Sequence, residues 1–376
     1  MKMELSDLTK QLRGLGMRWL GFPEKWLTVA ASMLVVSATL PIQADAQALG
    51  SYRLESATTL SSSNTSWDYV EFDQARGYLF IARRLDGLTV FNTKTKRIVA
   101  DIENSKGANG ILLLPAFNRI LVANTDGTVS VIDYQSLRFL DRVKIDEGGI
   151  NAGFFEPTTR QVFMVTSLRE KTSTIIAVEP KTGKSLARYN FDATKLDTPA
   201  VDGKGHMYVP IRYANQIAKI SAKDMKVVAT WPTGPCVNPV ALEFDRSANR
   251  LLAGCRGEKP VFVAMDVDTG AVMATVPIGR GIDGMVHDHE NKLIVTSNGA
   301  DANLVVIRQS GPDQYAAAET IATRPMARTM AIDAESKQLF LVTADHSIPA
   351  GNVDGKPKPT IYHKDTFAIL TYRQTE

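Results

Sequence analysis

Two closely spaced histidines are the residues of this sequence that most directly suggest chemistry. His287 and His289 stand in GIDGMVHDHENKLIVTSNG, residues 281–299. Imidazole nitrogens are common ligands of zinc and other transition metals, so the pair could bind a metal ion. The alternative is that this stretch is one copy of a repeated building block and that the histidines occupy a turn. Whether the histidines form a metal centre or belong to a scaffold depends on the secondary structure around them.

The chain lacks the short motifs that mark common catalytic and redox sites. It contains no G-x-S-x-G, H-E-x-x-H, C-x-x-C or C-x-x-C-H sequence. Any catalytic role must therefore come from residues that the fold brings together from distant parts of the chain.

A short strand pattern recurs seven times, at intervals of 41 to 46 residues. Its copies read GYLFIARR, NRILVANT, RQVFMVTS, GHMYVPIR, NRLLAGCR, NKLIVTSN and KQLFLVTA. Each follows an apolar run that ends in a turn, and each precedes a third apolar strand and a more polar fourth one. Four antiparallel strands in a repeat of about 43 residues are typical of a β-propeller blade.

We therefore expect an all-β fold, a seven-bladed β-propeller with four antiparallel strands per blade; an open β-solenoid is the alternative. The last repeat lacks a fourth strand, and residues 52–60 near the start of the chain could supply it. That pairing would close the ring through the N-terminal strand and remove exposed sheet edges. The expected blade cores lie near 67–104, 107–146, 149–192, 196–235, 236–279, 281–323 and 327–374.

Three stretches resemble a known family. GLTVFNTKTKRIVADI, AMDVDTGAVMATVPIGRGIDG and ARTMAIDAESKQLFLVTAD are similar to the YVTN-repeat, YncE-like seven-bladed propellers of exported bacterial proteins. The resemblance covers essentially all of the chain after residue 46 and implies the fold. It implies no single function, because the motifs are turns and strand cores and the fold is shared with quinoprotein dehydrogenases and lactonases.

Two sets of positions should converge on one face of such a ring, which we call the channel mouth. They are the start of each innermost strand and the end of each second strand. The first set is Asp68, Asn109, Asn151, Thr198, Asn238, Asp283 and Arg328. The second set is Arg83, Arg84, Asn124, Ser167, Arg212, Arg256, Asn298, Asp345 and His346.

These two sets support three interpretations. A planar guanidinium group suits carboxylate or phosphate, so an anion site is predicted at Arg84, Arg212, Arg256 and Arg328. Alternatively, the arginines form ion pairs between blades with Asp68, Asp283, Asp86 or Asp345. Finally, Ca²⁺ or Mg²⁺ could bind to the oxygen atoms of Asp68, Asn151, Asn238 and Asp283.

The seventh repeat carries an insertion of about twenty residues between Asp345 and Thr366, rich in Pro, Gly and Lys. It shows no strand pattern and starts at the channel mouth, which predicts a lid or a partner-docking loop. His346 at its start is the candidate general acid or base, because histidine titrates near neutral pH.

The repeat alignment moves the histidine pair away from this face. His287 takes the position held by Phe244 and Ile332 in other repeats, and His289 lies in the following turn. The pair is therefore expected on the opposite face, in a variable turn rather than in a metal site.

The first 46 residues differ from the rest of the chain. Basic residues are followed by the apolar segment 27–40 and by Ala44-Asp45-Ala46. This order predicts a signal peptide over residues 1–46 and a single periplasmic propeller over 47–376, with an uncleaved N-terminal anchor as the alternative. No later stretch reaches the about 20 apolar residues of a membrane span.

Charge and cysteine content restrict the partners and the compartment. Residues 47–376 contain 38 basic and 36 acidic side chains, and this formal charge of +2 argues against nucleic acid as a partner. Cys236 and Cys255 flank a predicted hairpin, so in an oxidising compartment a disulfide is expected rather than two free thiols.

Two functions remain open. The protein could be a non-enzymatic binding or scaffold propeller that presents its arginine-containing channel mouth to an anionic small molecule, a peptide or a protein partner. Alternatively, it could be a metal-assisted lactonase- or lyase-like enzyme, with a cation at the same mouth that polarises a carbonyl. The absence of a catalytic motif favours the first.

Overall fold

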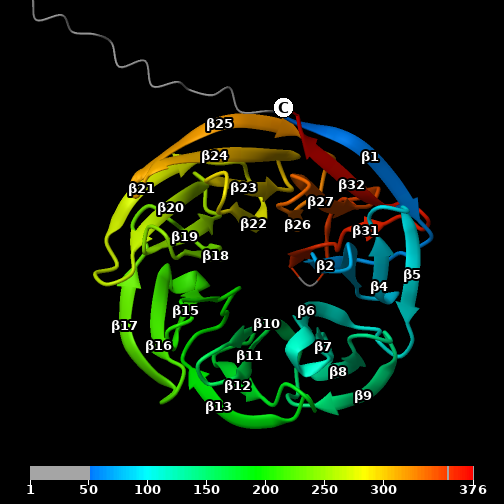
Figure 1. The fold of residues 1–376 in the computed structure, drawn as a ribbon, viewed down its shortest axis with the longest axis horizontal. Coiled ribbons are helices and arrows are strands. Elements are labelled where there is room, and N and C mark those ends of the chain that lie inside the picture. The colour runs from blue at the N-terminus through cyan, green and yellow to red at the C-terminus, as the bar shows by residue number, and fades with distance from the viewer. Residues whose placement is uncertain (1–50, 354, 376) are drawn as a thin grey trace, which may run out of the picture. The chain divides into compact units, whose positions relative to one another are not determined.

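Runs of β-branched and apolar residues, separated by short polar turns, form seven four-stranded antiparallel sheets arranged as a ring (Figure 1). The computed structural model describes residues 51–353 and 355–375. The expected seven-bladed propeller is confirmed. The predicted signal peptide, residues 1–46, lies outside the described residues.

Each blade contributes one innermost and one second strand. In blades 1 to 7 the innermost strands are β2 (Trp67–Asp73), β6 (Ala108–Leu114), β10 (Ile150–Glu156), β14 (Ala200–Val201), β18 (Pro239–Asp245), β22 (Ile282–Asp288) and β26 (Met330–Asp333). The second strands are β3 (Tyr78–Arg83), β7 (Arg119–Asn124), β11 (Gln161–Thr166), β15 (His206–Ile211), β19 (Arg250–Cys255), β23 (Leu293–Asn298) and β27 (Gln338–Thr343). Short 3₁₀ helices follow β6 and β15, namely η4 (Pro115–Phe117) and η5 (Arg212–Ala214).

The third and fourth strands complete the blades toward the rim. The third strands are β4 (Gly87–Asn92), β8 (Thr128–Asp133), β12 (Ser173–Val178), β16 (Gln216–Ser221), β20 (Val261–Asp266), β24 (Asn303–Gly311) and β32 (Phe367–Gln374). The fourth strands are β5 (Arg97–Ile102), β9 (Phe139–Lys144), β13 (Ser185–Phe191), β17 (Lys226–Pro232), β21 (Val272–Pro277), β25 (Gln314–Ala322) and β1 (Tyr52–Leu60).

The hydrophobic core lies between neighbouring blades. All six residues of β12 are buried, whereas the fourth strand β13 is mostly exposed. The middle strands are covered by a blade on each side, which is why their sequences are continuously apolar rather than alternating. The fourth strands face solvent along the rim and therefore carry more polar residues.

Blade 7 combines both ends of the described chain. β1 pairs antiparallel with β32, from Tyr52 opposite Gln374 to Leu60 opposite Phe367. The segment 52–60 therefore supplies the fourth strand that the last repeat lacks.

The turns between innermost and second strands share one construction in blades 5, 6 and 7. In blade 5, Asp245 Oδ1 accepts hydrogen bonds from the backbone N–H groups of Ser247 and Ala248, at 2.9 and 3.2 Å. Asp288 and Asp333 accept equivalent bonds in blades 6 and 7. The repeated Asp therefore has a structural role, because its carboxylate satisfies turn N–H groups that the sheet leaves unpaired.

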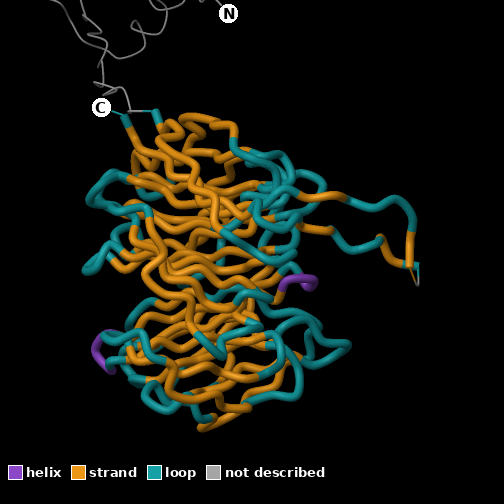
Figure 2. Tube along the Cα trace, turned by 90° about the vertical axis from the view of Figure 1, so that its right-hand side faces the viewer, coloured by secondary structure: helices purple, strands orange, loops and turns teal. Residues whose placement is uncertain are grey.

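The insertion in blade 7 folds back on itself as a hairpin. β28 (His346–Ser347) pairs with β31 (Ile361–Tyr362), and β29 (Asn352–Val353) pairs with β30 (Lys356–Pro357). Figure 2 shows this segment standing away from one face of the ring. The insertion therefore contains short strands that its sequence pattern did not indicate, and its role as a lid or docking loop stays a prediction.

Two further expectations can be compared with the structure. Cys236, before β18, and Cys255, at the end of β19, form a disulfide with a Cα–Cα distance of 5.2 Å. Within the residues described, no helix is long and apolar enough to cross a membrane.

Candidate functional site at the channel mouth

A β-bulge at the start of several innermost strands aims one side chain toward the mouth. The register shifts between Ile282 and Gly284 in blade 6, and between Ile150 and Ala152 in blade 3. An extra residue in one strand re-aims its side chain out of the regular alternation. We compare blades by counting back five positions from the residue that begins the turn to the second strand. In blades 1 to 7 the equivalent residues are Asp68, Asn109, Asn151, Asp197, Val240, Asp283 and Arg328.

Hydrogen bonds link these residues through blades 1 to 4. Arg84 lies 2.6 Å from Asp68 and donates to Asn109 Oδ1 at 2.8 and 3.0 Å. Asn109 Nδ2 donates to the backbone carbonyl of Asn151 at 2.8 Å. The Asn151 amide then donates to Asp197 at 3.3 Å. Asp197 also pairs with Arg212, which continues the chain of contacts to the end of β15, at 3.3 Å.

A second chain of contacts covers blades 5 to 7. Arg256 donates to the Asp283 carboxylate and, at 2.7 Å, to the backbone carbonyl of Ile282. Arg328 pairs with the same carboxylate at 3.0 Å and donates to the carbonyl of Trp67 at 2.9 Å. Asp283 is therefore shared between two guanidinium groups, and Arg328 joins blade 7 to blade 1.

Burial and charge perturb the carboxylates of the mouth. Burial raises the pKa of Asp68 to about 6, and the nearby Asp283 carboxylate adds to this effect, while Arg84 and Arg328 oppose it. Burial also raises the pKa of Asp197 against the opposing charges of Lys195 and Arg212.

The charged groups of the mouth do not cancel. The basic side chains are Arg84, Lys195, Arg212, Arg256 and Arg328, and the carboxylates are Asp68, Asp197 and Asp283. Five positive against three negative charges leave a formal charge of +2. The mouth thus has a positive excess inside a ring of ion pairs.

The ion-pair interpretation describes the contacts well. Arg256 and Arg328 make salt bridges between blades, while Arg84 pairs with Asp68 within blade 1. The side chain of Arg84 nevertheless stays 35 % exposed and that of Arg256 29 % exposed. These two guanidinium groups are structural and also reachable from solvent.

Several sequence-predicted positions take no part in these two chains of contacts, among them Asn298, Asn238 and Thr198. Asn298 is fully buried, and its amide donates to Thr296 and Asn303 inside blade 6. Asn238 lies in the loop before β18, and the bulge of that strand contains Val240 instead. Thr198 lies one residue beyond Asp197, which the sequence comparison missed. Counting five residues back from the acid of each turn would have found Asp197.

A cavity of about 290 Å³ continues from the mouth into the channel. It is lined by residues of β2, β18, β22 and β26. The Tyr69 hydroxyl from blade 1 lies 2.6 Å from the Thr198 hydroxyl of blade 4, so these side chains meet across the channel.

Two channel carboxylates were not anticipated. Glu71 and Glu243 line the cavity from blades 1 and 5. Burial raises the pKa of each to about 7, and the Glu71 charge adds to the shift at Glu243. Their common sequence signal is the tripeptide Glu-Phe-Asp, which ends both innermost strands.

The hairpin of blade 7 is anchored beside the mouth. Its Tyr362 is buried against Trp67, with 4.8 Å between ring centroids, and Arg328 lies over the same Trp67 ring at 5.2 Å. His346 lies beside Tyr362, at 6.2 Å between centroids, and lines a separate cavity with Arg324. The proposed acid or base is therefore not among the residues that line the channel.

At the far end of the channel, His287 lines the same cavity as Asp283. Burial and the neighbouring His289 lower the pKa of His287 to about 4, so its imidazole is neutral at physiological pH. Asp245 of blade 5 lies close to both rings. The alignment of the repeats predicted that the histidines lie near the end of this strand, but it did not predict that Asp245 lies beside them.

Comparison with known proteins supports the fold more than any function. No family model matches the chain. Two curated relatives, each described as "Uncharacterized protein YncE", from Salmonella typhi and Salmonella typhimurium, are 28% identical over 163 residues. The match covers 42% of this chain and spans only 44% of the length of each relative.

Solved structures extend the likeness over the whole ring. A chain of the "Crystal Structure of Mitotic Checkpoint Complex" has a TM-score of 0.66 at 12% identity and covers 96% of this chain and 100% of that one. The "Crystal structure of RRP9 WD40 repeats" has a TM-score of 0.66 at 7% identity and covers 86% and 100%. At such identities the likeness concerns the fold alone. The chain is therefore a seven-bladed β-propeller whose sequence is similar to YncE over 163 residues.

Proposed function

We propose that the protein is an exported, non-enzymatic binding propeller whose channel mouth holds an anionic peptide segment of a periplasmic partner. The observation that carries this proposal is the positive excess of the mouth, with five basic side chains against three carboxylates. Partly desolvated arginines bind carboxylates more strongly than fully solvated ones do.

Unused donors on the arginines support an anionic ligand. Within the described residues, Nη1 of Arg84 and Nη1 of Arg256 have no hydrogen-bond partner, because their contacts use Nε and Nη2. Nε of Arg212 is buried and also lacks a partner. A ligand oxygen at the mouth would satisfy these donors without breaking the ion pairs.

The rim around the mouth favours a peptide over a small inorganic anion. Exposed apolar side chains directly follow two of the arginines: Leu85 is 56 % exposed and Tyr213 is 55 % exposed. Leu168 in blade 3 is 60 % exposed in the corresponding connection. A peptide with alternating carboxylate and apolar side chains can contact both kinds of group.

The same contacts weigh against the metal-assisted enzyme. Asp68 and Asp283, the proposed ligands of Ca²⁺ or Mg²⁺, already accept hydrogen bonds from Arg84, Arg256 and Arg328. A divalent cation there would have to displace or oppose these guanidinium groups.

Export is proposed on two grounds. The basic and apolar order of residues 1–46 is that of a signal peptide. The Cys236–Cys255 disulfide suits an oxidising compartment such as the periplasm.

The binding proposal can be tested with a short peptide that alternates leucine and glutamate. Calorimetric titration should show binding to the wild type that weakens with salt, because the ligand contacts are ionic. Arg84→Gln and Arg256→Gln should each weaken it about tenfold to hundredfold, since a hydrogen bond to a charged group contributes about 1.5–3 kcal/mol.

Arg373→Gln is the matched control, because Arg373 pairs with Glu55 on the outer strands and is 47 % exposed. It should leave binding unchanged. Equal affinity of wild type, Arg84→Gln and Arg256→Gln would show that the arginines serve only as ion pairs.

A further inference from the structure

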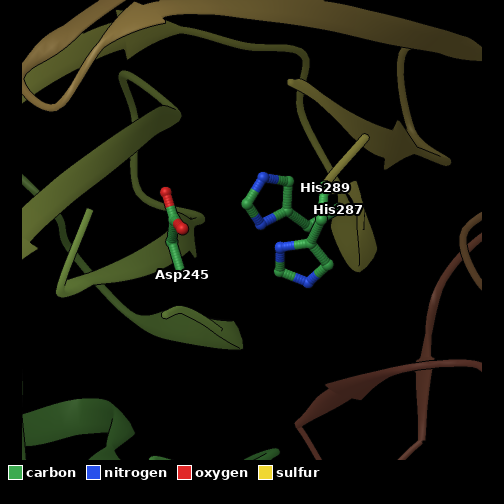
Figure 3. Close-up of side chains that lie close together, drawn as sticks. All are labelled: Asp245, His287 and His289. Carbon is green, nitrogen blue, oxygen red and sulfur yellow. The ribbon is translucent and has the colours of Figure 1, made fainter. Parts of the chain in front are cut away.

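Two histidines and one aspartate meet between blades 5 and 6, at the end of the channel away from the mouth. Figure 3 shows the His287 and His289 rings side by side, with the Asp245 carboxylate facing them. One ligand atom from each residue lies within 4.8 Å of the other two. The two ring centroids are 3.9 Å apart.

The fold creates this cluster from an unusual pair of residues. His287 occupies the position that holds Phe72 in blade 1 and Phe244 in blade 5. A phenyl ring there packs against its neighbours, whereas an imidazole adds a nitrogen that needs a partner. Nδ1 of His287 is buried and has no hydrogen-bond partner within the described residues. A buried polar atom left unpaired is costly, unless a ligand satisfies it.

Neighbouring side chains hold the aspartate in place. Asp245 Oδ2 accepts a hydrogen bond of 2.7 Å from Gln309, whose amide also donates to the Tyr315 hydroxyl at 2.9 Å. Oδ1 is fixed by the turn at Ser247. Such outer hydrogen bonds orient the carboxylate ligands of metal sites.

We propose that Asp245, His287 and His289 bind one divalent transition-metal ion. Zn²⁺ is the ion that we use to test this site. Two imidazoles and one carboxylate are a donor set for zinc, cobalt or nickel, whereas calcium and magnesium prefer oxygen ligands. Three protein ligands leave further coordination positions for water. His289 is exposed and His287 lines the channel cavity, so these positions are open to solvent.

The site is independent of the anion site at the mouth. Asp283 and His287 lie at opposite ends of β22, and none of the mouth arginines belongs to the cluster. Metal binding and peptide binding can therefore be measured and lost separately.

The test is a titration of the chelator-treated, purified protein with ZnCl₂, followed by calorimetry, and with CoCl₂, followed by visible absorption. We expect one ion per chain and no binding of MgCl₂ or CaCl₂. His289→Ala should weaken zinc binding about tenfold or more. His287→Phe should abolish it while keeping the fold, because phenylalanine is the residue of blades 1 and 5 at this position.

His363→Ala is the matched control, because His363 is an exposed histidine on the hairpin, bonded to Ser347 at 2.6 Å. It should bind zinc like the wild type. Failure of the wild type to bind a stoichiometric ion would overturn the proposal, as would unchanged affinity in His289→Ala. If His287→Phe does not fold, the exposed His289→Ala variant still decides.

Discussion

The channel carboxylates make the stability of this protein depend on pH in a direction opposite to that of most acidic residues. Burial raises the pKa of Glu71 from its usual 4.5 to about 7. The folded protein therefore holds this proton more tightly than the unfolded chain does. Below about pH 4.5 Glu71 is protonated in both the folded and the unfolded state, so its burial costs no stability. Stability is lost as the pH rises through the folded-state pKa of about 7.

The size of the effect follows from the shift. A difference of about 2.5 pKa units corresponds to about 3 kcal/mol at about 1.4 kcal/mol per unit. Glu71 is partly exposed to the channel, and water there reduces the cost, so we expect about 1–3 kcal/mol. Glu71→Gln keeps the shape of the side chain and removes its charge. At pH 8 the variant should exceed the wild type in stability by this amount, and at pH 4.5 the two should be equal within about 0.5 kcal/mol.

Urea unfolding followed by the fluorescence of the buried Trp67 and Trp231 measures this difference. Glu147→Gln is the control, because Glu147 is 98 % exposed, and it should show no pH-dependent gain. Because Glu71 also raises the pKa of Glu243, the double Gln variant should gain less than the sum of the two single variants. A Glu71→Gln variant with the same pH profile as the wild type would refute the reasoning.

Two further predictions concern the disulfide bond and the export of the protein. Reduction of the disulfide, or its replacement in Cys236→Ser/Cys255→Ser, should lower the stability of blade 5 by about 3 kcal/mol, seen as a lower urea midpoint; an unchanged midpoint would mean that the bond adds no constraint. N-terminal sequencing of the periplasmic fraction should find a chain that begins at Gln47, whereas an intact N-terminus on a membrane-bound protein would favour the uncleaved anchor.

The fold could be predicted because each repeat has a recognisable local sequence pattern. Strands such as GYLFIARR and KQLFLVTA recur at a nearly constant interval, and each turn acid caps its own turn. The pairing of 52–60 with the last repeat followed from a missing strand. These features depend on residues near one another in the chain or on simple counting.

The site was harder because bulges decide which side chains face the mouth. A shift of one residue separates Thr198 from Asp197, and Asn298 is buried although it ends its strand. Nothing in an alternating pattern reveals an inserted residue. Glu71 and Glu243 were missed for a related reason, since the sequence does not say which face of an innermost strand lines the channel.

Contacts between side chains of different blades could not be predicted from the sequence either. Asp245 and His287 are 42 positions apart in the chain, yet blades 5 and 6 place their side chains together. The hairpin of blade 7 has no alternating pattern, and its order comes from short pairings such as His346 with Tyr362.

The most direct test of anion binding at the channel mouth is one paired titration. The leucine–glutamate peptide and the same peptide with glutamine in place of glutamate are titrated into the wild type and into Arg84→Gln/Arg256→Gln. We predict that the wild type prefers the glutamate peptide by about tenfold or more, and that the double variant loses this preference. Equal affinity of the wild type for both peptides would contradict an anion site at the mouth.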